Sequence, residues 1–106
     1  MTVQFIEHMK PRSRPSTETE PMKRNKEAEI VYAIDEVIAE LRHGSALHGD
    51  FHSAHEGWAV IYEEVDELWE VVRMKRSARP PGAMYSEAKQ VAAMALKFML
   101  ADFAKP

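Results

Sequence analysis

The stretch IYEEVDELWEVV, residues Ile61–Val72, carries five carboxylates within eight residues, at Glu63, Glu64, Asp66, Glu67 and Glu70. Apolar residues recur through the same stretch every three or four positions, which is the spacing of an amphipathic α-helix. At about 100° per residue, Glu63, Glu67 and Glu70 fall on one helical face and the apolar residues on the opposite face. The stretch therefore predicts a long helix with one strongly acidic side.

Sequence signals mark where this acidic helix begins and ends. Ser53 and Glu56 have the spacing of a capping box, so we expect the helix to open at Ser53. It should run to about Arg76, because Pro80 and Pro81 cannot continue a helix. Its apolar stripe, which we expect to form core, consists of Trp58, Ile61, Val65, Leu68 and Val72.

Two further helices are predicted on either side. The first spans residues 23–43, with Gly44 in the position of a C-cap. The third runs from about Ser86 to Phe103 and is apolar almost all round, so it needs burial on more than one side. Three helices from one short chain can hardly surround it. We therefore expect an all-α helical bundle of about three long helices per chain, completed by oligomerisation.

Residues 1–22 differ from the rest of the chain. They contain Pro11, Pro15 and Pro21 around the polar run RSRPSTETEP, a composition typical of linkers. We expect an N-terminal tail or arm over residues 1–22 and one helical domain over residues 23–106.

The composition excludes several classes of protein. The chain has 106 residues, a net charge of −3 and no cysteine, so disulfides and thiolate metal sites are absent and nucleic-acid binding is not expected. No apolar run approaches the roughly 18–20 residues that span a bilayer. The N-terminus lacks the apolar region of a secretory signal. These features predict a cytoplasmic protein that does not bind membranes.

The crowding of carboxylates leaves two interpretations open. Glu63 and Glu67 are four residues apart and Glu64 and Glu67 three, spacings at which like charges destabilise a helix. In the third helix, Glu87 shares a face with apolar residues, where an unpaired carboxylate is costly. The acidic helix is either an ordinary solvated face or part of a cage for a divalent cation, because Mg²⁺ prefers carboxylate oxygens.

The acidic residues resemble a known motif. EEVDE at residues 63–67, followed after nineteen residues by Glu87, is similar to the E-E-x-x-E and E-x-x-D pattern of the MazG-like, all-α nucleoside triphosphate pyrophosphohydrolases. The flanks SAHEGWAVIYEEVDELWEVV and EAKQVAAMALKF also resemble the small phage and bacterial members. The resemblance covers roughly residues 30–103.

The resemblance implies a site and a reaction. Members of this family use Mg²⁺, with Mn²⁺ as a possible substitute, to split a nucleoside triphosphate between its α and β phosphates, and they assemble as homodimers or homotetramers. Carried over by position, the metal ligands are Glu63, Glu64, Glu67 and Glu87, and either Glu63 or Glu64 holds or deprotonates the attacking water. Gln90 occupies the position at which the family pattern has aspartate, so the fourth acidic ligand is replaced by a neutral amide.

Basic residues near the acidic helix are candidates for binding the substrate phosphates. They are Arg73, Lys75, Arg76 and Arg79, just after the acidic helix, and Lys89 in the third helix. For the first four, the alternative is that cations favour the C-terminal end of a helix. The first-helix acids Asp35 and Glu36 are expected to be solvated, with the alternative that an acid of the first helix faces the site.

The sequence thus supports a leading function and two alternatives. The leading interpretation is a Mg²⁺-dependent nucleoside triphosphate pyrophosphohydrolase that clears unwanted nucleotides. Gln90 favours the first alternative, a helical module that binds a nucleotide or metal with little or no turnover. The second is an interaction protein whose acidic face is only solvated surface.

Overall fold

The computed structural model describes residues 24–106, except for the side chains of residues 45–48, and these residues form helices without any strand. The elements are α2 (Lys26–His48), α3 (Ala54–Val72), the short 3-10 helix η1 (Arg76–Ala78), α4 (Ala83–Leu100) and the 3-10 helix η2 (Asp102–Ala104). The all-α prediction is confirmed, whereas the tail predicted over residues 1–22 lies outside the described residues. Residues 35–106, which include the second half of α2, form one compact unit.

Local hydrogen bonds set the ends of α2. The Asn25 side chain accepts a hydrogen bond from the Ala28 N–H at 3.1 Å, which makes Asn25 the N-cap. The prediction that Gly44 ends the helix is wrong, because α2 continues to His48. Gly49 follows with φ of 73°, the left-handed conformation that commonly terminates a helix.

Helix α3 begins as predicted and ends earlier than predicted. The Ser53 side chain accepts from the Glu56 N–H at 3.1 Å, which confirms the cap. The Glu56 carboxylate accepts from the backbone N–H of His52 at 2.5 Å, so the second half of the capping box involves His52. The guanidinium of Arg79 donates to the carbonyls of Val71 at 3.2 Å and Val72 at 2.6 Å, and α3 ends at Val72, short of the predicted Arg76.

Helix α4 starts and stops three residues before the predicted positions. Pro80 to Ala83 form a turn in which the Ala83 N–H donates to the Pro80 carbonyl and Gly82 has φ of 75°, as in a type II turn. The helix therefore begins at Ala83. It ends at Leu100 because Ala101 is extended, and the Phe103 ring then packs edge-on against Phe98 with centroids 5.1 Å apart.

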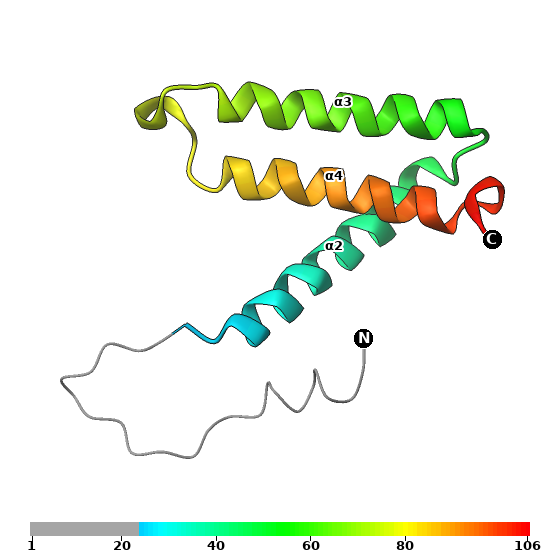
Figure 1. Cartoon of the computed structure of the whole chain (residues 1–106), viewed down its shortest axis with the longest axis horizontal. Coiled ribbons are helices and arrows are strands. Elements are labelled where there is room, and N and C mark those ends of the chain that lie inside the picture. Colours follow the sequence, from blue (N-terminus) through cyan, green and yellow to red (C-terminus); the bar gives the residue numbers. More distant parts are fainter. Residues whose placement is uncertain (1–23) are drawn as a thin grey trace, which may run out of the picture. The chain divides into compact units, whose positions relative to one another are not determined.

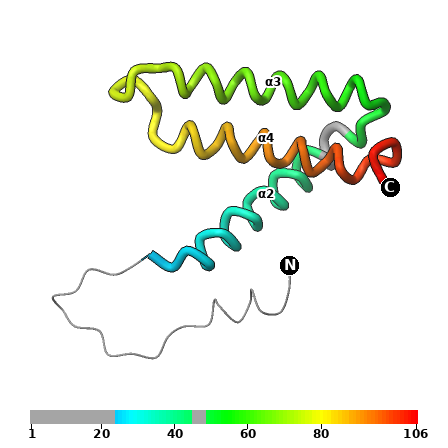
Figure 2. Tube along the Cα trace, in the orientation of Figure 1, coloured from blue at the N-terminus to red at the C-terminus, as the bar shows by residue number. Residues whose placement is uncertain are grey.

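Helices α3 and α4 run antiparallel, side by side, along most of their length (Figures 1 and 2). Gly57, which is buried in α3, lies directly against a side chain of α4. A Cβ atom at this position would lie 2.6 Å from Cδ2 of Phe98 and 3.1 Å from Cδ2 of Phe51. Glycine is required here because the Phe98 ring occupies the space that any side chain would need.

The predicted core stripe of α3 is only partly buried. Ile61 and Leu68 are half-buried against the rest of the unit, whereas Trp58 is 62% exposed and Val65 44% exposed. The side of α3 that faces α4 contains Gly57 and Glu64, about 100° around the helix from Trp58 and Val65. Within a single chain the stripe is therefore only partly core, because α4 packs beside it.

The hairpin of α3 and α4 buries little on its own. Among the described residues, the only buried apolar side chains are Ala93 and Ala101, and no large side chain is fully buried. None of the described helices combines the length and apolarity needed to cross a membrane.

We predict that Gly57→Ala destabilises the protein by about 1–3 kcal/mol, the usual cost of forcing extra volume into a packed contact. Helix propensity alone would favour alanine, so a loss must come from the clash with Phe98. The free energy of unfolding, measured by urea denaturation, checks this. In the double variant with Phe98→Leu, the two losses should be less than additive because leucine vacates the space. A stabilised single variant would show that the two helices are not in this contact.

Candidate metal centre

Three carboxyl groups from two helices share one side of the hairpin. Glu64 and Glu67 come from α3, and Glu87 comes from the second turn of α4. Glu64 and Glu87 are half-buried. One oxygen of Glu87, Oε2, is buried without a hydrogen-bond partner among the described residues. A buried carboxylate oxygen in this state is costly unless a cation or a proton satisfies it.

Burial and the charges of neighbouring carboxyl groups make Glu64 and Glu67 harder to ionise. The pKa of Glu64 is raised, first by burial and then by the charges of Glu67 and Glu87. The pKa of Glu67 is also raised, by partial burial of its carboxyl group and by the adjacent carboxyl of Glu87. Glu63, although exposed, adds to both shifts. No basic side chain among the described residues offsets this charge.

Glu40 in α2 is a member of this acidic group that the sequence interpretation missed. Its charge contributes to the raised pKa of Glu64. The sequence signal was its position one helical turn after Glu36, another α2 acid. Glu36 itself was expected to be solvated, and instead its carboxylate lies 3.6 Å from Nζ of Lys89 in α4. Glu36 therefore faces α4, and Glu40 acts on Glu64 of α3.

Glu70 and Gln90 have different settings. The Glu70 carboxylate accepts from the Arg73 guanidinium at 3.0 Å, and its charge is not among those that raise the pKa of Glu64 or Glu67. Gln90 is half-buried in α4, one turn after Glu87 and about 60° further round. Its assignment as a ligand stays a prediction.

The donor set suits a hard divalent cation. As the side chains stand, no three acidic or histidine groups of the described residues converge closely enough to enclose an ion. Mg²⁺, however, is commonly bound by one or two carboxylates together with waters and substrate phosphates, without an all-protein cage. Glu64, Glu67 and Glu87 with the unpartnered Oε2 fit such an ion, because they supply only carboxylate oxygens. Glu63 lies one residue from Glu64 at the exposed rim.

The predicted phosphate-binding residues divide into two groups. Arg79 caps the last carbonyls of α3, Arg73 pairs with Glu70, and Lys89 pairs with Glu36. Lys75 and Arg76 lie exposed in the connection that leads to α4, with no ion pair to another described residue. Of the five basic residues, Lys75 and Arg76 thus have the fewest contacts that would give them a structural role.

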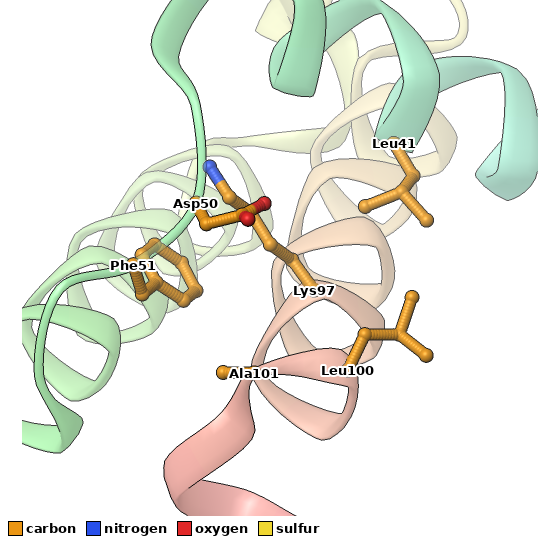
Figure 3. Close-up of a pocket in the computed structure, with 6 residues that line it drawn as sticks. All are labelled: Leu41, Asp50, Phe51, Lys97, Leu100 and Ala101. Atoms are coloured by element: carbon orange, nitrogen blue, oxygen red, sulfur yellow. The ribbon is translucent and has the colours of Figure 1, made fainter.

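A small pocket of about 70 Å³ lies towards the other end of α4 (Figure 3). It is lined by Leu41, Asp50, Phe51, Lys97, Leu100 and Ala101. Lys97 is only 8% exposed, and its ammonium lies 4.5 Å from the centroid of the Phe51 ring. The lysine stem fills apolar space while the aromatic ring stabilises its charge. This pocket contains none of the clustered glutamates.

The chain was compared with protein-family models, with curated proteins and with solved structures, and no match was found in any of the three. Membership of the MazG-like family therefore stays a prediction from the motif.

The raised pKa values of Glu64 and Glu67 predict a specific pH dependence. Because both groups bind a proton more readily when folded, their contribution to stability is full below about pH 4.5 and is lost as pH rises through their folded pKa values. Glu64→Gln removes one such group. Its melting temperature should match that of the unsubstituted protein near pH 4 and exceed it increasingly towards pH 7 in a metal-free buffer.

Glu70→Gln is the matched control, since Glu70 lies on the same helix and pairs with Arg73. It should gain no stability at neutral pH. A Glu64→Gln variant with the same difference in melting temperature at every pH would show that Glu64 does not sit in a repulsive cluster.

Proposed function

We propose that this chain is a Mg²⁺-dependent nucleoside triphosphate pyrophosphohydrolase that releases pyrophosphate and the nucleoside monophosphate. The observation that carries the proposal is the repulsion between the carboxyl groups of Glu64, Glu67 and Glu87 from two helices, together with the one Glu87 oxygen that has no hydrogen-bond partner among the described residues. A solvated acidic face would not press carboxylates from two helices against each other. The proposal also rests on the resemblance of EEVDE and Glu87 to the family motif.

The chemistry demands this kind of site. A triphosphate carries high negative charge, and attack by water adds more to the phosphorus oxygens. Mg²⁺ bound by Glu64, Glu67 and Glu87 would neutralise that charge and favour ionisation of the water. Mn²⁺ would serve similarly, because it also accepts carboxylate ligands.

Separate roles in the proposed reaction can be given to the acidic and basic residues of the chain. Between the two candidates for the base, Glu64 is favoured over Glu63, because its half-buried carboxyl has a raised pKa and so accepts a proton more readily. Glu63 at the exposed rim would help to hold the water or the metal's hydration shell. Lys75 and Arg76 are the basic residues most available to bind the outgoing phosphates, because Arg73, Arg79 and Lys89 already contact other groups.

The second candidate is a module that binds a nucleotide or metal with little turnover. Gln90 favours it, because an amide in place of a carboxylate lowers the negative charge available to the metal. The leading proposal, the pyrophosphohydrolase, also includes a cytoplasmic location and assembly from two or four copies of the chain. A screen of pyrophosphate release over canonical and modified nucleoside triphosphates, with Mg²⁺ and with Mn²⁺, separates the two functions.

We predict that Glu67→Gln abolishes metal-dependent pyrophosphate release while the helical content stays unchanged, because it removes a ligand and relieves repulsion from Glu87. Glu70→Gln should retain activity within about twofold, since Glu70 lies outside the cluster. The measurements are pyrophosphate release and circular dichroism of both variants. Loss of helicity together with activity in Glu67→Gln would make Glu67 a structural residue.

The second prediction concerns Gln90→Asp, which adds the charge that the family pattern expects. With Mg²⁺ the variant should bind metal more tightly and turn over faster. Without metal it should be less stable, because one more carboxylate joins an unneutralised cluster. Titration calorimetry and thermal denaturation with and without Mg²⁺ reveal this crossed response. An equal metal response in both proteins would place Gln90 outside the site.

A further inference from the structure

Gln90 lies on the part of α4 that is turned towards both α3 and α2. On the α3 side, the Phe98 ring occupies the space at Gly57, and on the α2 side, Nζ of Lys89 lies 3.6 Å from the Glu36 carboxylate. In helical projection Gln90 lies between Phe98 and Lys89, about 80° from the first and about 100° from the second. Gln90 is half-buried, whereas the opposite arc of α4 is exposed. It therefore borders both neighbouring helices.

Helix α2 presents Glu40 to the same part of α4. Glu36, Glu40 and Gly44 follow one another at intervals of four residues, so each lies about 40° round the helix from the one before. The outer two meet α4, because Glu36 pairs with Lys89 and a Cβ atom at Gly44 would lie 3.9 Å from Cε of Met94. Glu40 is half-buried midway between these contacts. It therefore faces residues 89–94 of α4.

Carboxylates from three helices approach Gln90 in this way. Besides burial, the charges that raise the pKa of Glu64 in α3 include those of Glu87 in α4 and of Glu40. Glu87 also has the buried oxygen, Oε2, without a hydrogen-bond partner among the described residues. Gln90 itself offers only a neutral amide at the position where the motif has aspartate. The site thus lacks one charge on α4 and has one additional carboxylate on α2.

Glu36 and Glu40 differ in their partners. Glu36 neutralises Lys89, the basic residue next to Gln90 in the sequence. Glu40 has no ion pair to another described residue, although it is half-buried. A partly buried carboxylate without a cation is unfavourable. The charge of Glu40 is therefore available to a cation bound at the site.

We propose that Glu40 is a further residue of the cation site and supplies the fourth acidic group that Gln90 does not provide. This inference rests on the proposed Mg²⁺ site and deepens it, because a third helix, α2, then takes part in holding the cation. Mg²⁺ usually keeps several of its waters when it binds to a protein. The Glu40 carboxylate can therefore act on the ion directly or accept hydrogen bonds from its waters, and in both cases its charge favours binding.

Glu40→Gln tests this role in the full chain, because it removes the charge and keeps the shape of the side chain. Titration calorimetry should show Mg²⁺ binding weakened at least tenfold, the loss common when a group that holds or orients a metal ligand is removed. In metal-free buffer at pH 7 the same variant should melt at a higher temperature than the unsubstituted chain, because repulsion of Glu64 is relieved. Asp35→Asn is the matched control, since it removes a charge from an exposed position of α2, and it should change the affinity less than about twofold.

Adding Gln90→Asp to Glu40→Gln separates a role in the site from a structural one. The aspartate returns the missing charge from α4, so the double variant should recover most of the lost Mg²⁺ affinity. The gain from Gln90→Asp should also be larger in this background than in the unsubstituted chain, because the two groups serve the same site. A loss that Gln90→Asp does not restore would overturn the inference, whether or not circular dichroism shows reduced helicity.

The outcomes keep this inference apart from the proposed function. Equal Mg²⁺ affinity of the unsubstituted chain and of Glu40→Gln would overturn the inference and leave the site of Glu64, Glu67 and Glu87 standing. An unsubstituted chain that binds no Mg²⁺ would overturn both. An affinity that is weakened and then restored supports the role of Glu40 even if no pyrophosphate is released, in which case only the proposed reaction fails.

Discussion

The contact between Gly57 and the Phe98 ring governs how α3 is turned relative to α4. Because glycine has no Cβ, the ring lies directly against the α3 backbone, with Phe51 beside it. This contact directs the Gly57 and Glu64 side of α3 towards α4, and it leaves the Trp58 and Val65 side uncovered. A shift of one residue in the contact would exchange the two sides. The placement of the carboxylates and of the exposed aromatics both follow from it.

The same rotation explains why charge is concentrated between the helices. With Glu64 facing α4 and Glu87 facing α3, carboxylates from both helices meet where a typical hairpin would place leucines. Two agents can relieve the repulsion, a proton or a cation. A divalent ion neutralises two charges at once. The proposed cation site would therefore account for the crowding of carboxylates between the helices.

The sequence predicted the helices, the Ser53 cap and the acidic character of α3, because these depend on local spacing. It did not predict the end of α2, since only the left-handed Gly49 distinguishes that end from Gly44. The Val72 end involves Arg79, which donates to carbonyls seven and eight residues earlier, and the Leu100 end is followed by Phe103, which packs on Phe98 five residues earlier. Neither contact follows from helical periodicity.

Helical periodicity also shows which residues share a face, but not which face meets a neighbour. For that reason the exposure of Trp58 and the contribution of Glu40 to the site emerged only from the packing. The glutamates of the motif could be grouped from sequence because three of the four lie on one helix. Glu87 joined them only through the resemblance and the expected pairing of helices.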